Sequence, residues 1–178
     1  MRKTVLFILL ITQSVVAQTI KGTFLQAKNT EIVVKSFEGF IEKELTKTTC
    51  DSVGNFTIHY PIEYTGAALL QIQNTSSVIV LLNHENFEMQ WENFQDFTTL
   101  KFINSPENEA FAKGFAINQE IEQKLTGLRY LLPLYQNNTT NENWLQNEIS
   151  NQEQIFEKYI ESLPKESYVK HYLTYRKY

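Results

Sequence analysis

The residues of this sequence best suited to chemistry are its single cysteine, Cys50, and the nearby His59. A cysteine thiolate beside a histidine is a nucleophile, so such a pair could support covalent catalysis. The segment 51–56, "DSVGNF", predicts a hairpin turn, because Asp and Gly tolerate tight and left-handed backbone. Closure of that hairpin would place Cys50 opposite Thr57 and diagonally across from His59, within about 7 Å.

A structural role for Cys50 is the stronger hypothesis. An activated thiol needs a helix amino terminus or a nearby positive charge, and a hairpin strand supplies neither. No third residue stands in position to orient the imidazole of His59. Because the sequence has no second cysteine for a disulfide, Cys50 is predicted to be a small, half-buried residue at the end of a strand.

The rest of the sequence predicts no catalytic, cofactor-binding or metal-ligating residues. The three histidines, His59, His84 and His171, belong to different predicted elements and lack the short spacing of a metal site. Neither a glycine-rich phosphate loop nor a Gly-x-Ser-x-Gly motif occurs. The aromatic residues, 13% of the chain, follow strand and helix periodicity, which indicates core filling. We therefore expect no cofactor and no enzyme activity for this chain by itself.

The amino terminus predicts export. Residues 1–17 combine the basic Arg2 and Lys3, an apolar run and small residues before Gln18, as a secretory signal peptide does. The run is too short to span a membrane, and Gln18 stands where a lipoprotein carries its lipidated cysteine. Without the leader, 14 basic residues face 20 acidic ones, a poor match to nucleic acid. We expect a periplasmic or cell-envelope protein that lies near a membrane without spanning it.

The sequence after the leader changes periodicity at about Asn104. Before that residue, short alternating or apolar runs are separated by turns, which predicts an antiparallel β-sandwich-like domain at 18–104. The run 76–83 does not alternate and is predicted to be a strand buried on both faces. The predicted strands cover residues 19–26, 30–37, 40–49, 54–61, 67–74, 76–83, 86–93 and 97–104.

Residues 105–178 predict a helical connector segment of two to three helices, which makes the whole chain α+β. Ser105 stands at an N-cap position and Pro106 at the first helical position, and Pro133 ends this helix. Asp in place of Ser105 should cap equally well. A second helix is expected at 139–163, where a capping box precedes an apolar stripe.

A short third helix is predicted close to the last residue. Its apolar side has no later segment of the sequence to cover it, so we expect it to contact another domain or chain. The residues of this stripe are Tyr168, Val169, Tyr172, Leu173 and Tyr175.

The order of these segments resembles a domain of unknown function at the front of exported thiol-disulfide interchange proteins. The resemblance rests on Gly22, on Asp51, Gly54 and Phe56 in a D-x-x-G-x-F turn, and on the Ser-Pro pair at 105–106. It covers essentially the whole sequence after the leader. In that family a β-rich module and a helical connector precede a thioredoxin-like domain of the TlpA or AhpC/TSA type. The Cys-x-x-Cys motif that the family uses for redox chemistry is absent from this sequence.

These observations leave three functional hypotheses. The first, implied by the resemblance, is a non-catalytic accessory module for a thioredoxin-like domain in cis or in trans, with its last helix partly unpacked. The second is a freestanding envelope protein that binds a peptide or glycan at the sheet edge or in an aromatic groove, with all helices docked. The third, a Cys50-dependent enzyme, requires a low thiol pKa. The sequence leaves a homo-oligomer open for each of them.

Overall fold

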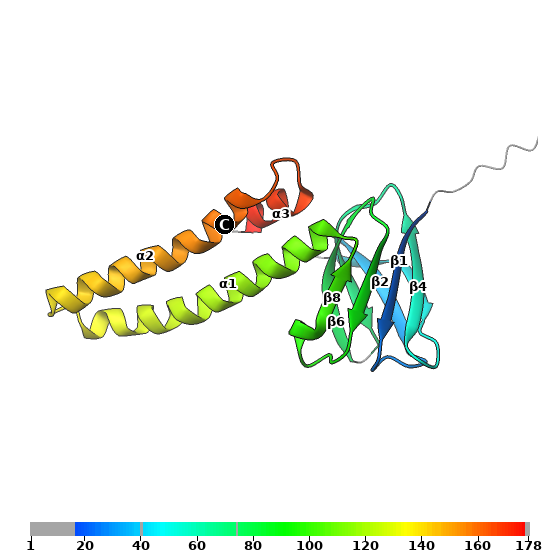
Figure 1. Ribbon diagram of the computed structural model, residues 1–178, viewed down its shortest axis with the longest axis horizontal. Helices are drawn as coiled ribbons and strands as arrows, with labels where there is room; N and C mark the ends of the chain where they lie inside the picture. The colour runs from blue at the N-terminus through cyan, green and yellow to red at the C-terminus, as the bar shows by residue number, and fades with distance from the viewer. Residues whose placement is uncertain (1–16, 40, 74, 177–178) are drawn as a thin grey trace, which may run out of the picture.

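The protein is an α+β structure in which a run of strands precedes the α-helices (Figure 1). The computed structural model describes residues 17–39, 41–73 and 75–176, and the predicted leader lies outside this range apart from Ala17. Each predicted strand and helix is present, which confirms the fold class read from periodicity. The strands are β1 (Ala17–Phe24), β2 (Glu31–Glu38), β3 (Ile41–Thr49), β4 (Asn55–Pro61), β5 (Thr65–Ile72), β6 (Ser76–Asn83), β7 (Phe87–Trp91) and β8 (Leu100–Ile103). The helices are α1 (Pro106–Leu131), α2 (Thr139–Ser162) and α3 (Tyr168–Arg176), with short 3-10 helices η1 (Phe97–Thr99) and η2 (Leu132–Leu134).

The strands form two four-stranded sheets that pack face to face. The first sheet has the order β4-β1-β7-β8 and the second β3-β2-β5-β6. Neighbouring strands pair antiparallel, as predicted, with the exception of the parallel pair β1 and β7. That pair is parallel because β7 reaches β1 after the chain has crossed through the second sheet, and not through a hairpin.

The core between the sheets follows the alternation of the sequence. Phe56, Ile58 and Tyr60 of β4 are at most 5% exposed, whereas Thr57 and His59 face outward. Aromatic rings fill the end of the core near β7, where Trp91 packs edge-on against Phe94 with ring centres 4.8 Å apart. Burial of these large apolar side chains supplies the main stabilisation of the sandwich.

β6 is buried on both faces from Val80 to Leu82, as predicted for this segment, although it lies at the edge of its sheet. Val80 and Leu82 point into the core between the sheets. Leu81 points the other way and belongs to a second apolar cluster, which the helices form with the outer face of this sheet. Apolar and polar residues do not alternate in this segment because both faces of the strand contact an apolar cluster.

α1 begins where the sequence predicts and is fastened to β6. The hydroxyl oxygen of Ser105 accepts a hydrogen bond from the backbone N–H of Asn108 at 3.4 Å, and Pro106 is the first helical residue. The Asn108 side chain then bonds the edge strand. Its Oδ1 accepts from the Leu81 N–H at 2.7 Å, and its Nδ2 donates to the Leu81 carbonyl at 2.8 Å.

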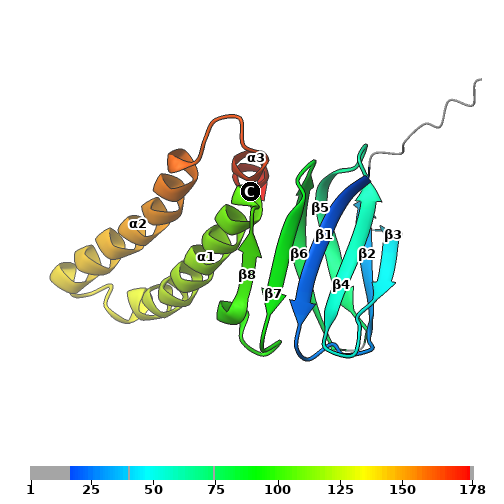
Figure 2. The same ribbon diagram turned by 45° about the vertical axis from the view of Figure 1, so that its right-hand side comes forward.

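α1 and α2 form a helical hairpin that projects away from the sandwich, with α3 at its base (Figure 2). The predicted capping box of α2 is one residue out of place. Asn138 is the N-cap, because its Oδ1 accepts from the Asn141 N–H at 3.2 Å, and Thr139 is the first helical residue. Asn is at least as good a cap as Thr, which explains why the helix starts there.

The surroundings of Ser105 argue against the expectation that Asp would replace it without loss. Ser105 is fully buried, and its hydroxyl donates a hydrogen bond to the Glu85 carboxylate. Burial raises the pKa of the Glu85 carboxyl; the Ser105 hydroxyl opposes this shift, and the carboxylates of Glu107 and Glu109 add to it. A carboxylate at position 105 would therefore lie next to the Glu85 carboxyl, whose ionised form burial already disfavours.

We expect Ser105→Asp to lower the free energy of unfolding by about 2 kcal/mol at pH 7, since it buries a second negative charge. Glu85→Gln should raise that free energy, because the amide still accepts from Ser105 and removes a charge whose pKa folding raises. In the wild type, the protonated Glu85 carboxyl stabilises the folded protein at low pH, and the protein loses that stability as pH rises through the folded-state pKa of Glu85. In the Glu85→Gln background, Ser105→Asp should cost less than half as much, measured by urea unfolding. An equal cost in both backgrounds would refute the role given to Glu85.

Candidate functional site

The structure separates the two residues that the sequence placed together. β3 and β4 belong to different sheets, so Cys50 does not lie opposite Thr57, and that expectation is wrong. The Cys50 side chain points into the core between the sheets and is 2% exposed, more buried than predicted. His59 lies on the outer face of β4, where its Nδ1 is 3.2 Å from the Thr19 hydroxyl.

The surroundings of Cys50 disfavour its thiolate. Burial, and after it the negative charge of Asp51, raise the pKa of the Cys50 thiol to about 11. A nucleophilic cysteine requires the opposite shift, which a helix amino terminus or a cation provides. The backbone N–H of Cys50 donates to the Thr30 carbonyl at 3.0 Å, so this residue ties the end of β3 to the start of β2.

The D-x-x-G-x-F turn has a structural explanation. The Asp51 carboxylate accepts from the backbone N–H groups of Val53 and Asn55 at 2.9 and 2.8 Å. These bonds, that of Asn55 first, lower the pKa of Asp51. Gly54 has φ +95°, and its carbonyl accepts from the Phe24 N–H at 2.9 Å. The turn therefore lets the chain pass from one sheet to the other, which a simple hairpin would not do.

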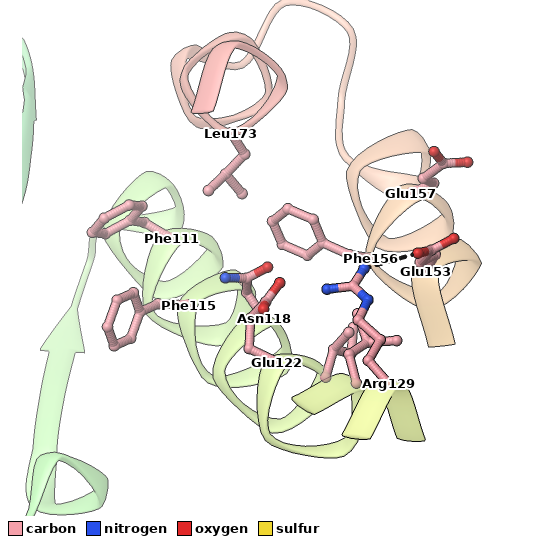
Figure 3. Close-up of a pocket in the computed structure, with 12 residues that line it drawn as sticks. Phe111, Phe115, Asn118, Glu122, Arg129, Glu153, Phe156, Glu157 and Leu173 are labelled. Carbon is pink, nitrogen blue, oxygen red and sulfur yellow. Dashed lines mark hydrogen bonds and ion pairs between the residues drawn. The ribbon is translucent and has the colours of Figure 1, made fainter. Parts of the chain in front are cut away.

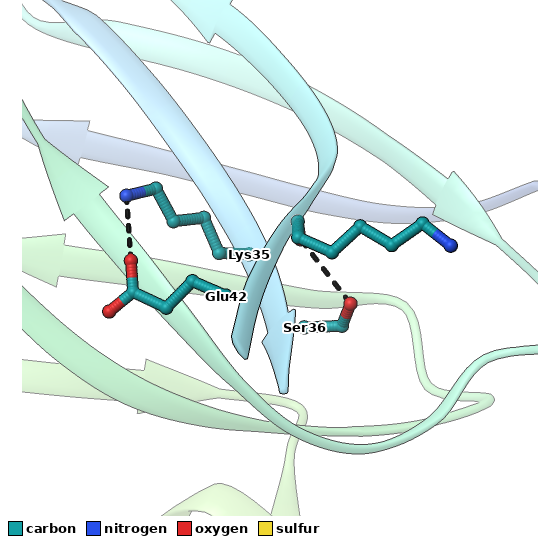
Figure 4. Close-up of polar contacts among 4 residues, drawn as sticks. Lys35, Ser36 and Glu42 are labelled. Carbon is teal, nitrogen blue, oxygen red and sulfur yellow. Dashed lines mark hydrogen bonds and ion pairs between the residues drawn. The ribbon is translucent and has the colours of Figure 1, made fainter. Parts of the chain in front are cut away.

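The exposed edge of the second sheet is poorly suited to strand addition. At β3 the pairing register shifts between Val34 and Lys35. The Lys35 ammonium pairs with Glu42 at 2.8 Å across the strands, and the Ser36 hydroxyl donates to the Lys43 carbonyl at 3.3 Å (Figure 4). Charged side chains and a bulge are the features that protect edge strands from pairing. At the opposite edge, the Asn108 side chain already bonds the backbone N–H and carbonyl of Leu81 in β6.

A groove between the helices is the more promising surface (Figure 3). It has a volume of about 510 Å³, within the range of ligand pockets. Phe156 points into it from α2 and Leu173 from α3, with α1 along its length. The apolar residues that line it are Phe111, Phe115, Ile121, Leu125, Phe156 and Leu173.

The polar rim of the groove is acidic. Its polar residues are Asn118, Glu122, Arg129, Glu153 and Glu157. Arg129 bonds the Glu153 carboxylate at 3.0 Å and joins α1 to α2 at the end of the groove away from α3 (Figure 3). Because this pair is neutral in sum, Glu122 gives the rim a net negative charge. The sequence predicted both helices but not that they leave a groove between them.

The stripe on α3 is covered within the chain, and the expectation that another domain covers it is wrong for its central residues. Val169 and Leu173 are 1% and 4% exposed and pack with Phe111 and Ile160 in the second apolar cluster. Tyr175, at 82% exposed, is the member that faces solvent. The helix hairpin folds back over this stripe, and the sequence pattern alone does not reveal such long-range contacts.

Other kinds of site are not evident within the described part of the chain. No group of three or more His, Cys, Asp or Glu side chains there could hold a metal ion. Among the described helices, none combines the length and the apolar character needed to cross a bilayer.

Comparison with known proteins supports no particular function. No model of a known protein family matches the sequence, and no curated protein matches it. Among solved structures, a 9R-lipoxygenase from Cyanothece PCC8801 is similar over 43% of this chain, with a TM-score of 0.32 and 16% sequence identity. The chain spans 16% of that lipoxygenase, and a likeness this weak carries no argument.

The burial of Cys50 predicts a slow thiol. At pH 8, iodoacetamide should modify Cys50 in the native protein at least about 100-fold more slowly than in urea, because both access and ionisation require opening. Between pH 9 and pH 11, the free energy of unfolding should fall by about 2 to 3 kcal/mol more in the wild type than in Cys50→Ala. Other titrating groups affect both proteins equally and cancel in this difference. The sign follows because folding raises this pKa, so the unfolded state loses its proton first. Rapid modification of the folded protein near pH 7 would contradict this assignment.

The two glycines of α1 provide a test of how closely the helices pack at the groove. A Cβ at Gly114 would lie 2.8 Å from Leu173 Cδ1 and 2.9 Å from Tyr159 Cε1, whereas a Cβ at Gly127 meets nothing within 4 Å. Gly127→Ala should therefore raise the free energy of unfolding by about 0.5 to 1 kcal/mol through helix propensity. Gly114→Ala should lose that gain and loosen α3, measured as faster amide hydrogen exchange in α3. Equal stabilisation by both changes would show that α3 does not pack as described.

Proposed function

We propose that this chain is a non-catalytic binding module of the cell envelope whose helical groove receives an amphipathic helix of a partner protein. The observation that carries this proposal is the open apolar groove between α1 and α2, with a net negative rim. Grooves of this kind bind a helix through apolar side chains spaced three or four residues apart.

The lengths of the helices favour a helical partner. α1 and α2 are about 39 and 36 Å long, whereas α3 is about 14 Å long, from a rise of 1.5 Å per residue. α3 therefore covers only the part of the hairpin next to the sandwich. From Phe111 to Arg129 the lining residues of α1 extend over about 27 Å. A partner helix lying beyond Leu173 would complete a three-helix arrangement along the hairpin.

The chemistry of the groove defines the partner further. Ile121 and Leu125, at 5% and 3% exposed, form a buried apolar floor, and Phe115, at 52% exposed, presents an accessible ring at the edge of the groove. Glu122 favours Lys or Arg at the edge of the partner's apolar face. We therefore propose a partner helix with an apolar face flanked by basic residues.

The proposed location and partner class rest on the sequence. The leader pattern supports export to the periplasm or cell envelope. The resemblance to the front domain of exported thiol-disulfide interchange proteins supports a thioredoxin-like domain, in cis or in trans, as the carrier of the partner helix. The docked α3 helix fits the binding protein hypothesis better than an unpacked connector does. The buried thiol of Cys50 supports a non-catalytic role.

Model peptides provide the direct test. A fluorescent amphipathic 18-residue peptide of Leu and Lys should bind the wild-type chain, as measured by anisotropy, and the same peptide with Glu for Lys should bind at least about tenfold more weakly. Phe115→Asp should weaken binding of the Lys peptide at least about tenfold, because it removes the exposed apolar ring of the groove and puts a charge in its place. Phe37→Asp, which changes an exposed ring on β2, is the matched control and should bind as the wild type does.

The outcomes separate the groove from the partner. Equal binding of both peptides, or equal effects of the two substitutions, would refute the groove as the site. For the partner class, a photo-crosslinker placed at position 115 in cells should capture a thioredoxin-like protein, whereas the same group at position 37 should not. Capture of such a protein only from position 37 would contradict the proposed orientation.

A further inference from the structure

The end of the helical hairpin exposes apolar and aromatic side chains that the groove does not use. We call residues 130–144 the hairpin tip; it lies at the end of the molecule opposite the sandwich (Figure 1). Its exposed large apolar side chains are Tyr130 (73%), Leu131 (38%), Leu134 (66%), Tyr135 (40%) and Trp144 (59%). A cluster of this kind on a projection normally marks an interaction surface.

The hairpin tip is uncharged over most of its length. From Tyr130 to Asn141 the sequence "YLLPLYQNNTTN" contains no Asp, Glu, Lys, Arg or His, although a fifth of the whole chain is Asp, Glu, Lys or Arg. Tyr and Trp combine an apolar ring with a polar end, and such side chains are favoured at the boundary between lipid headgroups and acyl chains.

The dimensions of the hairpin tip match shallow insertion into a bilayer surface. Tyr130 lies one residue before the end of α1, and Trp144 is the sixth residue of α2, about 8 Å from its start. Interfacial elements bury their apolar side about 5 to 10 Å into the headgroup boundary. Glu142 lies two residues before Trp144, which places it about 200° away around the helix axis. An oblique approach therefore buries Trp144 and leaves Glu142 in water.

We propose that the hairpin tip inserts into the surface of a zwitterionic lipid bilayer and attaches the protein to a membrane without spanning it. A lipid surface fits better than a protein partner, because the exposed side chains stand on a projection at the far end of the molecule from the sandwich (Figure 1). The acidic balance of the chain argues against attraction to anionic lipid. Apolar burial and aromatic side chains therefore drive attachment.

This inference stands apart from the proposed groove function. Phe115 and Tyr130 are separated by about 22 Å along α1. The groove ends at Arg129, between the sandwich and the tip, so the tip can rest on lipid while the groove binds its partner. Loss of one activity should leave the other unchanged.

The two tryptophans make attachment directly observable. Trp91 is fully buried in the sandwich, whereas Trp144 is exposed on the hairpin tip. We expect phosphatidylcholine vesicles to move the emission of residues 18–178 to shorter wavelength, and lipids brominated on the acyl chain near the headgroup to quench it. These residues omit the apolar leader, which would itself bind lipid, and keep the described elements except the first residue of β1. Trp144→Phe should abolish the spectral change while the protein still sediments with vesicles.

Substitutions test whether the tip is the contact. Leu134→Asp should reduce partitioning onto phosphatidylcholine vesicles at least about tenfold in sedimentation, because it removes an apolar side chain and adds a charge. Ile41→Asp changes an aliphatic residue of similar exposure, 71%, on β3, and should partition as the wild type does. Circular dichroism establishes that each variant is folded. Binding should persist in 0.5 M NaCl, since apolar burial is not screened by salt.

Three results would overturn the proposal. The first is no sedimentation of the folded wild type with phosphatidylcholine vesicles. The second is binding that requires anionic lipid and disappears in 0.5 M NaCl, which would point to charge and not to the tip. The third is a dimer that Leu134→Asp disrupts, in the absence of vesicle binding, which would assign the tip to a second copy of this chain.

Discussion

The packing of the helices against the sandwich depends on one buried side chain, Asn108. Its amide pairs with both backbone groups of Leu81 and takes the place of a neighbouring strand at the edge of the second sheet. A buried backbone N–H and carbonyl left without partners would each cost about 1 to 3 kcal/mol. The same amide donates to the Ser105 hydroxyl at 2.8 Å, so the cap of α1, the edge strand and the first helical turn form one polar connection inside an apolar surface.

The second apolar core follows from this connection. Once α1 is held at Leu81, Phe111 faces the outer side of β6, and Val169 and Leu173 of α3 close over it. Glu107 accepts from the Tyr168 and Val169 N–H groups at 3.0 and 2.7 Å and so stabilises the amino end of α3. α3 therefore packs as part of the fold, which makes the groove beyond it a defined surface with a fixed end at Leu173.

The distribution of charge then divides the hairpin into two regions. Along most of the hairpin, Glu122 and Glu157 border an apolar groove, whereas the far end carries exposed aromatic and aliphatic side chains without charge. The ion pair between Arg129 and Glu153 lies where these regions meet. It joins α1 to α2, with the Arg129 guanidinium nitrogen 3.0 Å from the Glu153 carboxylate oxygen. Being exposed, this pair contributes little stability, but it fixes where the groove ends. The sandwich, with its buried thiol and protected edge, serves as the rigid support for the hairpin.

Periodicity in the sequence was sufficient to predict the strands, the start of α1 at Ser105 and the double burial of β6, because each depends on residues close together in the chain. The sequence does show a polar residue, Asn108, on the same helix face as Phe111 and Phe115. It does not show that Leu81 is the hydrogen-bond partner of this residue. Tertiary structure alone decided that Cys50 and His59 belong to different sheets, that Val169 and Leu173 are covered, and that the helices leave a groove. Each of these outcomes depends on contacts between residues far apart in sequence. The same local pattern is compatible with several such pairings, and only the packing of the whole chain selects one.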